Sequence, residues 1–168
     1  AHDLVELVGA VDRVQHAKAG VAELVGGGLV ELQVAEVEAA GLVPDLLHAA
    51  VDDLVAVCTE LGTRAPFCLG GDSAGGGIAL AAALRLRSCV GPTPRGVALL
   101  CPFVRQLASS PLSQAYVQQG SFDDPGASPL FAYLSGLPPL FVQTGTADHL
   151  HAQAVDLVNR ASSAGVRA

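Results

Sequence analysis

The residues best suited to chemistry are the sequence GDSAG at 71–75. A serine flanked at two residues on each side by glycine is typical of a sharp turn that carries a nucleophile. A short apolar run at 67–69 predicts a strand before the turn, and an Ala/Leu-rich stretch at 74–87 predicts a helix after it. This context predicts that the Ser73 hydroxyl is exposed above the carboxyl end of the strand.

The same turn offers a site for negative charge. The backbone amide of Ala74 falls at the N-terminus of the predicted helix, where such groups stabilise an oxyanion. Gly71 and Gly75 lack the β-carbons that would clash in so tight a turn. Two other interpretations of the motif stay open: a glycine-rich phosphate-binding turn, and a serine that only caps the helix.

Short apolar strands alternate with helices through the later part of the chain. Further helices are predicted at 49–61 and 151–164, and further strands at 96–101 and 140–143. The stretch at 104–137 is rich in proline and glycine, which predicts loops. Continuous apolar strands that alternate with helices imply an α/β fold, with a mostly parallel sheet and helices on both faces.

The first forty residues differ in composition from the rest. Residues 1–50 hold eight acidic and two basic residues, and the first aromatic residue is Phe67. Few large side chains bury little apolar area, so this stretch is expected to contribute little to a core. We therefore divide the chain into an atypical N-terminal segment at 1–41 and a domain at 42–168. A frameshifted reading frame is one hypothesis for the composition of the segment.

Within this segment the local pattern is mainly helix-like. Apolar residues from Leu4 to Val14 recur at the helical spacing i, i+3, i+4. The glycines at 26–28 interrupt the pattern and predict a turn. Partial alternation of apolar residues at 29–34 then predicts a strand.

Composition narrows the class of partner. The chain has 168 residues, of which 51% are hydrophobic, and a net charge of −7. A negative balance disfavours a nucleic-acid partner, because affinity for phosphates depends on basic residues. The sequence contains no apolar run long enough for a membrane span and no visible signal peptide. These features indicate a globular domain of the cytoplasm.

The four cysteines are Cys58, Cys68, Cys89 and Cys101. They form no CxxC pair, and no Cys/His cluster has the spacing of zinc ligands. They are expected to be free and buried, as in a reducing compartment. No metal and no organic cofactor is expected.

Several runs together resemble one enzyme family. The sequence GDSAGG at 71–76 resembles the nucleophile turn of the hormone-sensitive-lipase group of α/β-hydrolases, which are carboxylesterases and lipases. The runs ASPLF at 127–131 and LSGLPPL at 134–140 are similar to the family's sequence before its acid, and GTADHL at 145–150 is similar to its G-x-x-D-x-L. The resemblance covers roughly residues 42–168. Gly77 stands where the family often has asparagine.

The resemblance implies a partial α/β-hydrolase fold and hydrolysis of carboxylic esters through an acyl-serine intermediate. It implies Ser73 as the nucleophile, Ala74 as an oxyanion donor and Asp148 as the acid that orients a histidine. Asp148 is also placed to cap the helix that begins at 151. For the family's upstream HGGG oxyanion loop the candidates are Gly26 and Gly27, and a plain turn is the other interpretation.

The triad also needs a base, and none of the five histidines holds the family's position for it. In the family the histidine comes beyond the helix that follows the acid. His149 and His151 directly follow Asp148, and they are expected to be solvated residues at a helix start. The other histidines precede the serine turn, and they are His2, His16 and His48.

The expected function is therefore hydrolysis of a small-molecule ester, impaired by the missing histidine. Two alternatives stay open. One is a non-catalytic protein of the same fold that binds a small molecule. The other is a gene fragment without independent function.

Overall fold

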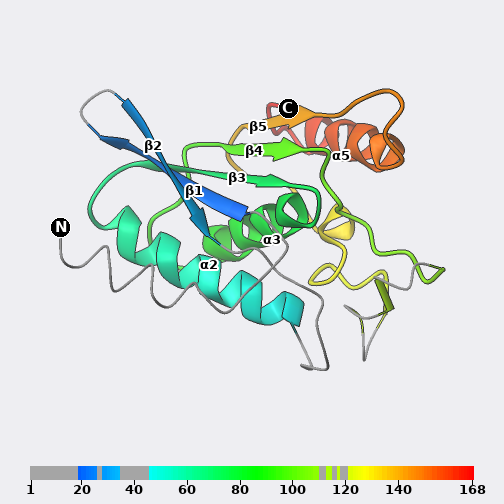
Figure 1. Cartoon of the computed structure of the whole chain (residues 1–168), viewed down its shortest axis with the longest axis horizontal. Coiled ribbons are helices and arrows are strands. Elements are labelled where there is room, and N and C mark those ends of the chain that lie inside the picture. Colours follow the sequence, from blue (N-terminus) through cyan, green and yellow to red (C-terminus); the bar gives the residue numbers. More distant parts are fainter. Residues whose placement is uncertain (1–18, 26–27, 35–45, 110–112, 115–116, 118–120) are drawn as a thin grey trace.

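The computed structural model describes residues 19–25, 28–34, 46–109, 113–114, 117 and 121–168. Within them, five strands form one sheet in the order β2-β1-β3-β4-β5 (Figure 1). The strands are β1 (Ala19–Val25), β2 (Gly28–Val34), β3 (Phe67–Asp72), β4 (Val97–Leu100) and β5 (Leu140–Gln143). The helices are α2 (Leu46–Gly62), α3 (Ala74–Ser88) and α5 (His151–Ser163), with a short 3₁₀ helix, η1 (Pro129–Phe131). The α/β class predicted from the sequence is confirmed.

Strands β3, β4 and β5 run parallel, and they are the strands that the apolar runs predicted. They also end together, because Asp72 lies opposite Leu100 and Leu100 lies opposite Gln143. The segments that follow these three strands therefore begin at one edge of the sheet. Residues that follow different strands are brought together there.

The core lies on one face of the sheet. Leu69, Val97 and Leu140 lie opposite one another in neighbouring strands, and all three are buried. Side chains of α2, α3 and α5 join the same apolar cluster. The sequence predicts helices on both faces of the sheet, and the described helices join the core on this face. Phe141 of β5 points toward the opposite face and is 60% exposed. The largest apolar side chains at the centre of this core include Leu54, Ile78, Leu80, Leu99 and Leu157.

The C-terminal end of α3 is fastened by two arginines. The Arg87 guanidinium donates to the backbone carbonyls of Tyr133 at 2.6 Å and Ser135 at 2.7 Å. Arg85 pairs with Asp52 of α2 on the surface. Positive charge in the last turn also suits the negative end of the helix dipole. Together these contacts fix α3, and hence the turn that precedes it, against α2 and the loop before β5.

Strand β1 corrects one sequence expectation. The pattern before the glycines is helix-like, yet residues 19–25 form a strand that pairs antiparallel with both β2 and β3. The neighbouring edge of β3 presents backbone N–H and C=O groups that need partners, and this pairing outweighs a weak helical pattern. The strand predicted at 29–34 is confirmed as β2. The helix predicted from Leu4 to Val14 lies outside the described residues, and the division at residue 41 stays a prediction.

All four cysteines are free. Cys58 is buried, as expected, and burial raises the pKa of its thiol to about 12. Cys68 and Cys101 are half-buried. The expectation of burial is wrong for Cys89, which is exposed because it follows the last turn of α3.

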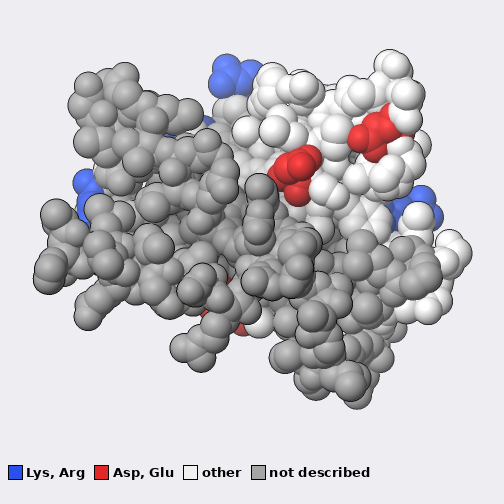
Figure 2. All heavy atoms as spheres, in the orientation of Figure 1, with Lys and Arg blue, Asp and Glu red and all other residues white. Residues whose placement is uncertain are grey.

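Figure 2 shows one face of the molecule, on which the described acidic and basic side chains stand apart among uncharged residues. The charges of the described residues on this face are therefore scattered and form no continuous stripe. None of the described helices combines the length and the apolar character that a bilayer crossing requires.

Candidate functional site

Ser73 connects β3 to α3 in a backbone conformation that residues other than glycine rarely adopt. Its φ is 54° and its ψ is −119°. Such a conformation costs on the order of 1–3 kcal/mol and persists only where the surrounding structure holds it. The residue is exposed, as the motif predicted, and its side chain makes no capping hydrogen bond to α3. The helix-capping interpretation is therefore wrong.

Close backbone approaches explain the glycines of this turn. A β-carbon on Gly71 would lie 2.2 Å from the carbonyl oxygen of Gly75. A β-carbon on Gly77 would lie 2.3 Å from the carbonyl oxygen of Phe103. Both distances are far below van der Waals contact. Gly77, where the resembled family often has asparagine, thus allows α3 to pack closely on the segment after β4.

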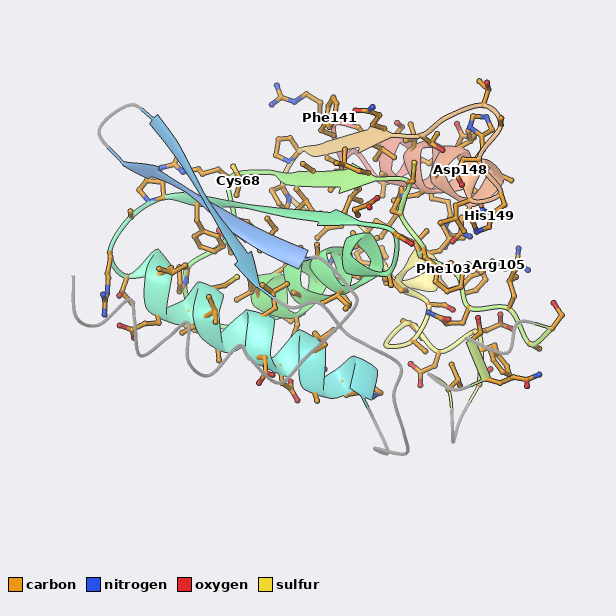
Figure 3. All side chains as sticks on the ribbon, viewed as in Figure 1. Cys68, Phe103, Arg105, Phe141, Asp148 and His149 are labelled. Carbon is orange, nitrogen blue, oxygen red and sulfur yellow. The ribbon has the colours of Figure 1, made fainter. Side chains whose placement is uncertain are left out.

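Two backbone hydrogen bonds hold the turn to the neighbouring strand. The Ser73 N–H donates to the Leu100 carbonyl at 3.0 Å, and the Phe103 N–H donates to the Ser73 carbonyl at 2.8 Å. The segment after β4 therefore supports the strained serine from both sides. Figure 3 shows Phe103 at the carboxyl ends of the strands, together with Asp148 and His149, whereas Cys68 lies toward the other end of the sheet.

Of the three predicted oxyanion donors, Ala74 lies among the described residues. Ala74 is the first residue of α3, so its N–H belongs to the turn whose amides have no acceptor within the helix. These amides and the helix dipole favour negative charge beside Ser73. Gly26 and Gly27 lie outside the described residues.

Asp148 lies in the loop between β5 and α5. One carboxylate oxygen, Oδ1, accepts the Leu150 N–H at 2.7 Å, and its own N–H donates to the Gly145 carbonyl at 3.0 Å. A hydrogen bond with the Cys101 thiol and then the Leu150 amide lower the pKa of Asp148, because both stabilise the ionised form. The residue that directly precedes α5 is Leu150, so Asp148 does not occupy the capping position itself.

The two nearby histidines differ from each other. The His149 side chain is 89% exposed, as expected of a solvated residue, and its Nδ1 lies 3.5 Å from Oδ1 of Asp148. This distance is longer than an ordinary N–H···O hydrogen bond. His151 was also expected to be solvated, but its Nδ1 is buried without a partner among the described residues. Neither imidazole has a described hydrogen bond with Ser73.

The predicted residues thus share one edge of the sheet without direct contact between them. Ser73 follows β3, Asp148 follows β5, and β4 lies between the two strands. Among the described contacts, none joins the side chains of Ser73 and Asp148. The residue that directly follows β4 at this edge is Cys101, which the sequence did not indicate as a site residue. Its position before Pro102, at the end of an apolar run, was the available signal.

Comparison with known proteins agrees with this geometry. Residues 45–168 match a protein family described as alpha/beta hydrolase fold. A triacylglycerol lipase of Mycobacterium tuberculosis (strain ATCC 25618 / H37Rv) is 43% identical over 91 residues, which cover 54% of this chain and 21% of the relative. An acetyl-hydrolase of Streptomyces hygroscopicus is 31% identical over 140 residues, which cover 70% of this chain and 47% of the relative. The chain thus spans less than half the length of both relatives.

Solved structures give the same picture. The crystal structure of an esterase from the bacterial hormone-sensitive lipase family superposes with a TM-score of 0.65 at 31% sequence identity. The match covers 83% of this chain and 54% of that esterase. A hormone-sensitive lipase from a metagenome library superposes with a TM-score of 0.68 at 26% identity, over 84% of this chain and 54% of the other.

Proposed function

We propose, since this chain belongs to the α/β-hydrolase fold family, that it carries the nucleophile and the acid of a serine hydrolase acting on carboxylic esters. The observation that supports this most strongly is the exposed Ser73 at φ 54°, in the turn between β3 and α3. Strained backbone of this kind clusters at functional sites. The esterase and lipase relatives favour the same chemistry.

In the proposed reaction, the Ser73 hydroxyl attacks the carbonyl carbon of the ester. The carbonyl oxygen becomes an oxyanion, which the Ala74 N–H and the N-terminal end of α3 stabilise. Collapse of this intermediate expels the alcohol and leaves an acyl group on Ser73. Water then attacks the acyl-serine, and the carboxylic acid leaves. No step requires a metal or an organic cofactor.

The proposed role of Asp148 is to orient a histidine base and to stabilise its protonated form. Its lowered pKa suits this role, because the carboxylate stays ionised through the neutral range. His149 lies beside Asp148, but it is almost fully exposed. A solvated imidazole without a described bond to Ser73 is a poor general base. We therefore infer that this chain by itself turns esters over slowly.

Hydrolysis of p-nitrophenyl butyrate tests this inference. The variants are Ser73→Ala and the double variant His149→Ala/His151→Ala, with Ser163→Ala as a control because Ser163 is exposed on α5. A positioned base contributes about 10²–10⁴ in rate. We expect all three variants and the unsubstituted protein to stay far below about 1 s⁻¹, the lower end of typical turnover.

Faster turnover that is abolished by Ser73→Ala would contradict our inference that Ser73 acts here without a positioned base. If the double histidine variant also lost it, one of these two histidines would be the base. Binding of an ester analogue that raises the melting temperature without any labelling of Ser73 would instead favour a non-catalytic binding protein.

A further inference from the structure

The Ser73 turn and the Asp148 loop lie at one end of the sheet, joined by no described contact between the two side chains. The turn is bonded to the segment after β4, since the Phe103 N–H donates to the Ser73 carbonyl at 2.8 Å. The next two residues, Val104 and Arg105, belong to no helix or strand. Val104 is buried, so its backbone amide needs an acceptor from another part of the protein.

One side chain of α5 supplies this acceptor. The carboxamide oxygen of Gln153, Oε1, accepts the Val104 N–H at 2.7 Å and the Arg105 N–H at 2.8 Å. Both distances lie at the short end of the range for N–H···O hydrogen bonds. A carboxamide oxygen has two lone pairs, and two backbone donors occupy both of them here. The Gln153 side chain therefore holds two successive residues of the segment after β4.

Gln153 also lies close to the acid, in the first turn of α5. The helix begins at His151, whose N–H donates to the Asp148 carbonyl at 3.0 Å. The N–H of Leu150, the residue before the helix, donates to Oδ1 of Asp148 at 2.7 Å. The start of α5 thus bonds to the acid through its backbone and to the segment after β4 through Gln153.

These hydrogen bonds form a continuous path between the two candidate groups. It runs from Ser73 to Phe103 and the two residues after it, then through Gln153 to the start of α5 and Asp148. Figure 3 shows Phe103 and Arg105 at the same end of the sheet as Asp148. The other described backbone bonds of residues 101–104 lead to the Ser73 turn, β5 and η1. Gln153 therefore provides the connection of this segment to α5.

We propose that Gln153 is a positioning residue: its carboxamide oxygen holds the segment after β4 against the first turn of α5, and so fixes the Ser73 turn relative to Asp148. That these two groups act on an ester rests on the proposed function. The connection itself does not depend on turnover, and it is measured without a substrate.

Amide hydrogen exchange, followed by NMR for each residue, tests the connection. Gln153→Met keeps an unbranched side chain of similar length but removes the acceptor, whereas Gln153→Glu keeps an oxygen that accepts both amides. Gln114→Met is the matched control. It removes a hydrogen bond that the Gln114 side chain donates to the Ala108 carbonyl, only six residues earlier in the chain.

In Gln153→Met we expect the Ser73 and Leu150 amides to exchange about tenfold faster, because the loss of the shared acceptor favours local opening at both ends of the path. Gln153→Glu and Gln114→Met are expected to exchange like the unsubstituted protein. The buried Leu80 in the middle of α3 reports global unfolding, and its amide is expected to change less. Faster exchange at Leu150 alone, or equally at Leu80, overturns the proposal.

A second measurement uses the conservative variant and does not depend on the folding of Gln153→Met. In Gln153→Glu, two backbone N–H groups donate to the introduced carboxyl group, which lowers its pKa below the ordinary value of about 4.3. In Gln114→Glu the introduced group is exposed, and we expect the ordinary value. NMR of the carboxyl carbon measures both. Equal pKa values in the two variants overturn the proposal.

Labelling of Ser73 by a fluorophosphonate separates this proposal from the proposed function. We expect Gln153→Met to slow the labelling several-fold and Gln153→Glu to restore it, with no change in Gln114→Met. Labelling of Gln153→Met at the unsubstituted rate overturns the positioning role. If exchange responds as expected but Ser73 is labelled in none of the chains, the hydrolase function is wrong and the connection through Gln153 stands.

Discussion

The turn at 71–77 and the pair of strands β1 and β2 belong to one sheet, but they are held in different ways. In the turn, the backbone packs so closely that a β-carbon on Gly71 would lie 2.2 Å from another backbone atom. Strand β1, by contrast, is joined to β3 through backbone pairing from Ala19 to Glu23. Backbone pairing accepts many sequences, whereas close packing admits few residue types. This difference explains how a stretch of unusual composition continues the sheet beside a turn whose sequence is highly specific.

The largest expected effect comes from the closest packing. Gly71→Ala puts a β-carbon against the Gly75 backbone, which cannot move without opening the turn. We expect a loss of about 3 kcal/mol in the free energy of unfolding, the upper end of overpacking effects, and loss of the Ser73 geometry. The measurement is urea denaturation.

Gly70→Ala is the matched control, one residue earlier in β3. Its β-carbon would meet only the Ala98 carbonyl at 3.7 Å, an ordinary contact. We expect its free energy of unfolding to stay within about 1 kcal/mol of the unsubstituted protein. Equal losses in the two variants would show that the turn is not specially constrained.

A smaller effect is expected from removal of β1 and β2. A chain that begins at Leu42 loses the pairing between β1 and β3. Each net hydrogen bond contributes about 1 kcal/mol, but ordering each residue costs about 1–2 kcal/mol, so the two terms largely cancel. We expect urea denaturation to show a change of about 1–2 kcal/mol. A loss of more than about 4 kcal/mol would show that the N-terminal segment packs as a part of the core.

The smallest effect concerns acid stability. The folded protein lowers the pKa of Asp148 through the Cys101 and Leu150 hydrogen bonds. This contribution is fully present above the unfolded value of about 3.9 and is lost as the pH falls through the folded pKa. We expect Asp148→Asn to flatten the decline of stability in that acid range, whereas Ser73→Ala leaves it unchanged. Identical acid declines in Asp148→Asn and the unsubstituted protein would contradict the lowered pKa.

Much of the later fold was predictable because its signals are local. The helix predicted at 151–164 is α5 at His151–Ser163, and the strand predicted at 140–143 is β5 at the same residues. Apolar spacing, glycine and proline decide such elements within a few residues of the chain. The position of Ser73 was predictable for the same reason, since the strand, turn and helix that carry it are contiguous.

The features that were not predictable depend on which strands become neighbours in the sheet. β1 was missed because its reason to be extended is the edge of β3, more than forty residues later in the chain. The position of Cys101 beside the end of β5 was not predictable for the same reason: only the pairing of β4 with β5 brings its N–H to the Gln143 carbonyl. Its place at a helix start predicts a solvated His151, yet the fold buries its Nδ1 at the start of α5.

The central claim is that Ser73 is a nucleophile held in a strained turn, and a fluorophosphonate inhibitor tests it most directly. The reagent forms a covalent bond with an activated serine oxygen, and mass spectrometry locates the adduct. We expect slow labelling at Ser73 in the unsubstituted protein and in Ser163→Ala, and none in Ser73→Ala. Labelling of Ser73→Ala at the same rate as the unsubstituted protein would contradict the account.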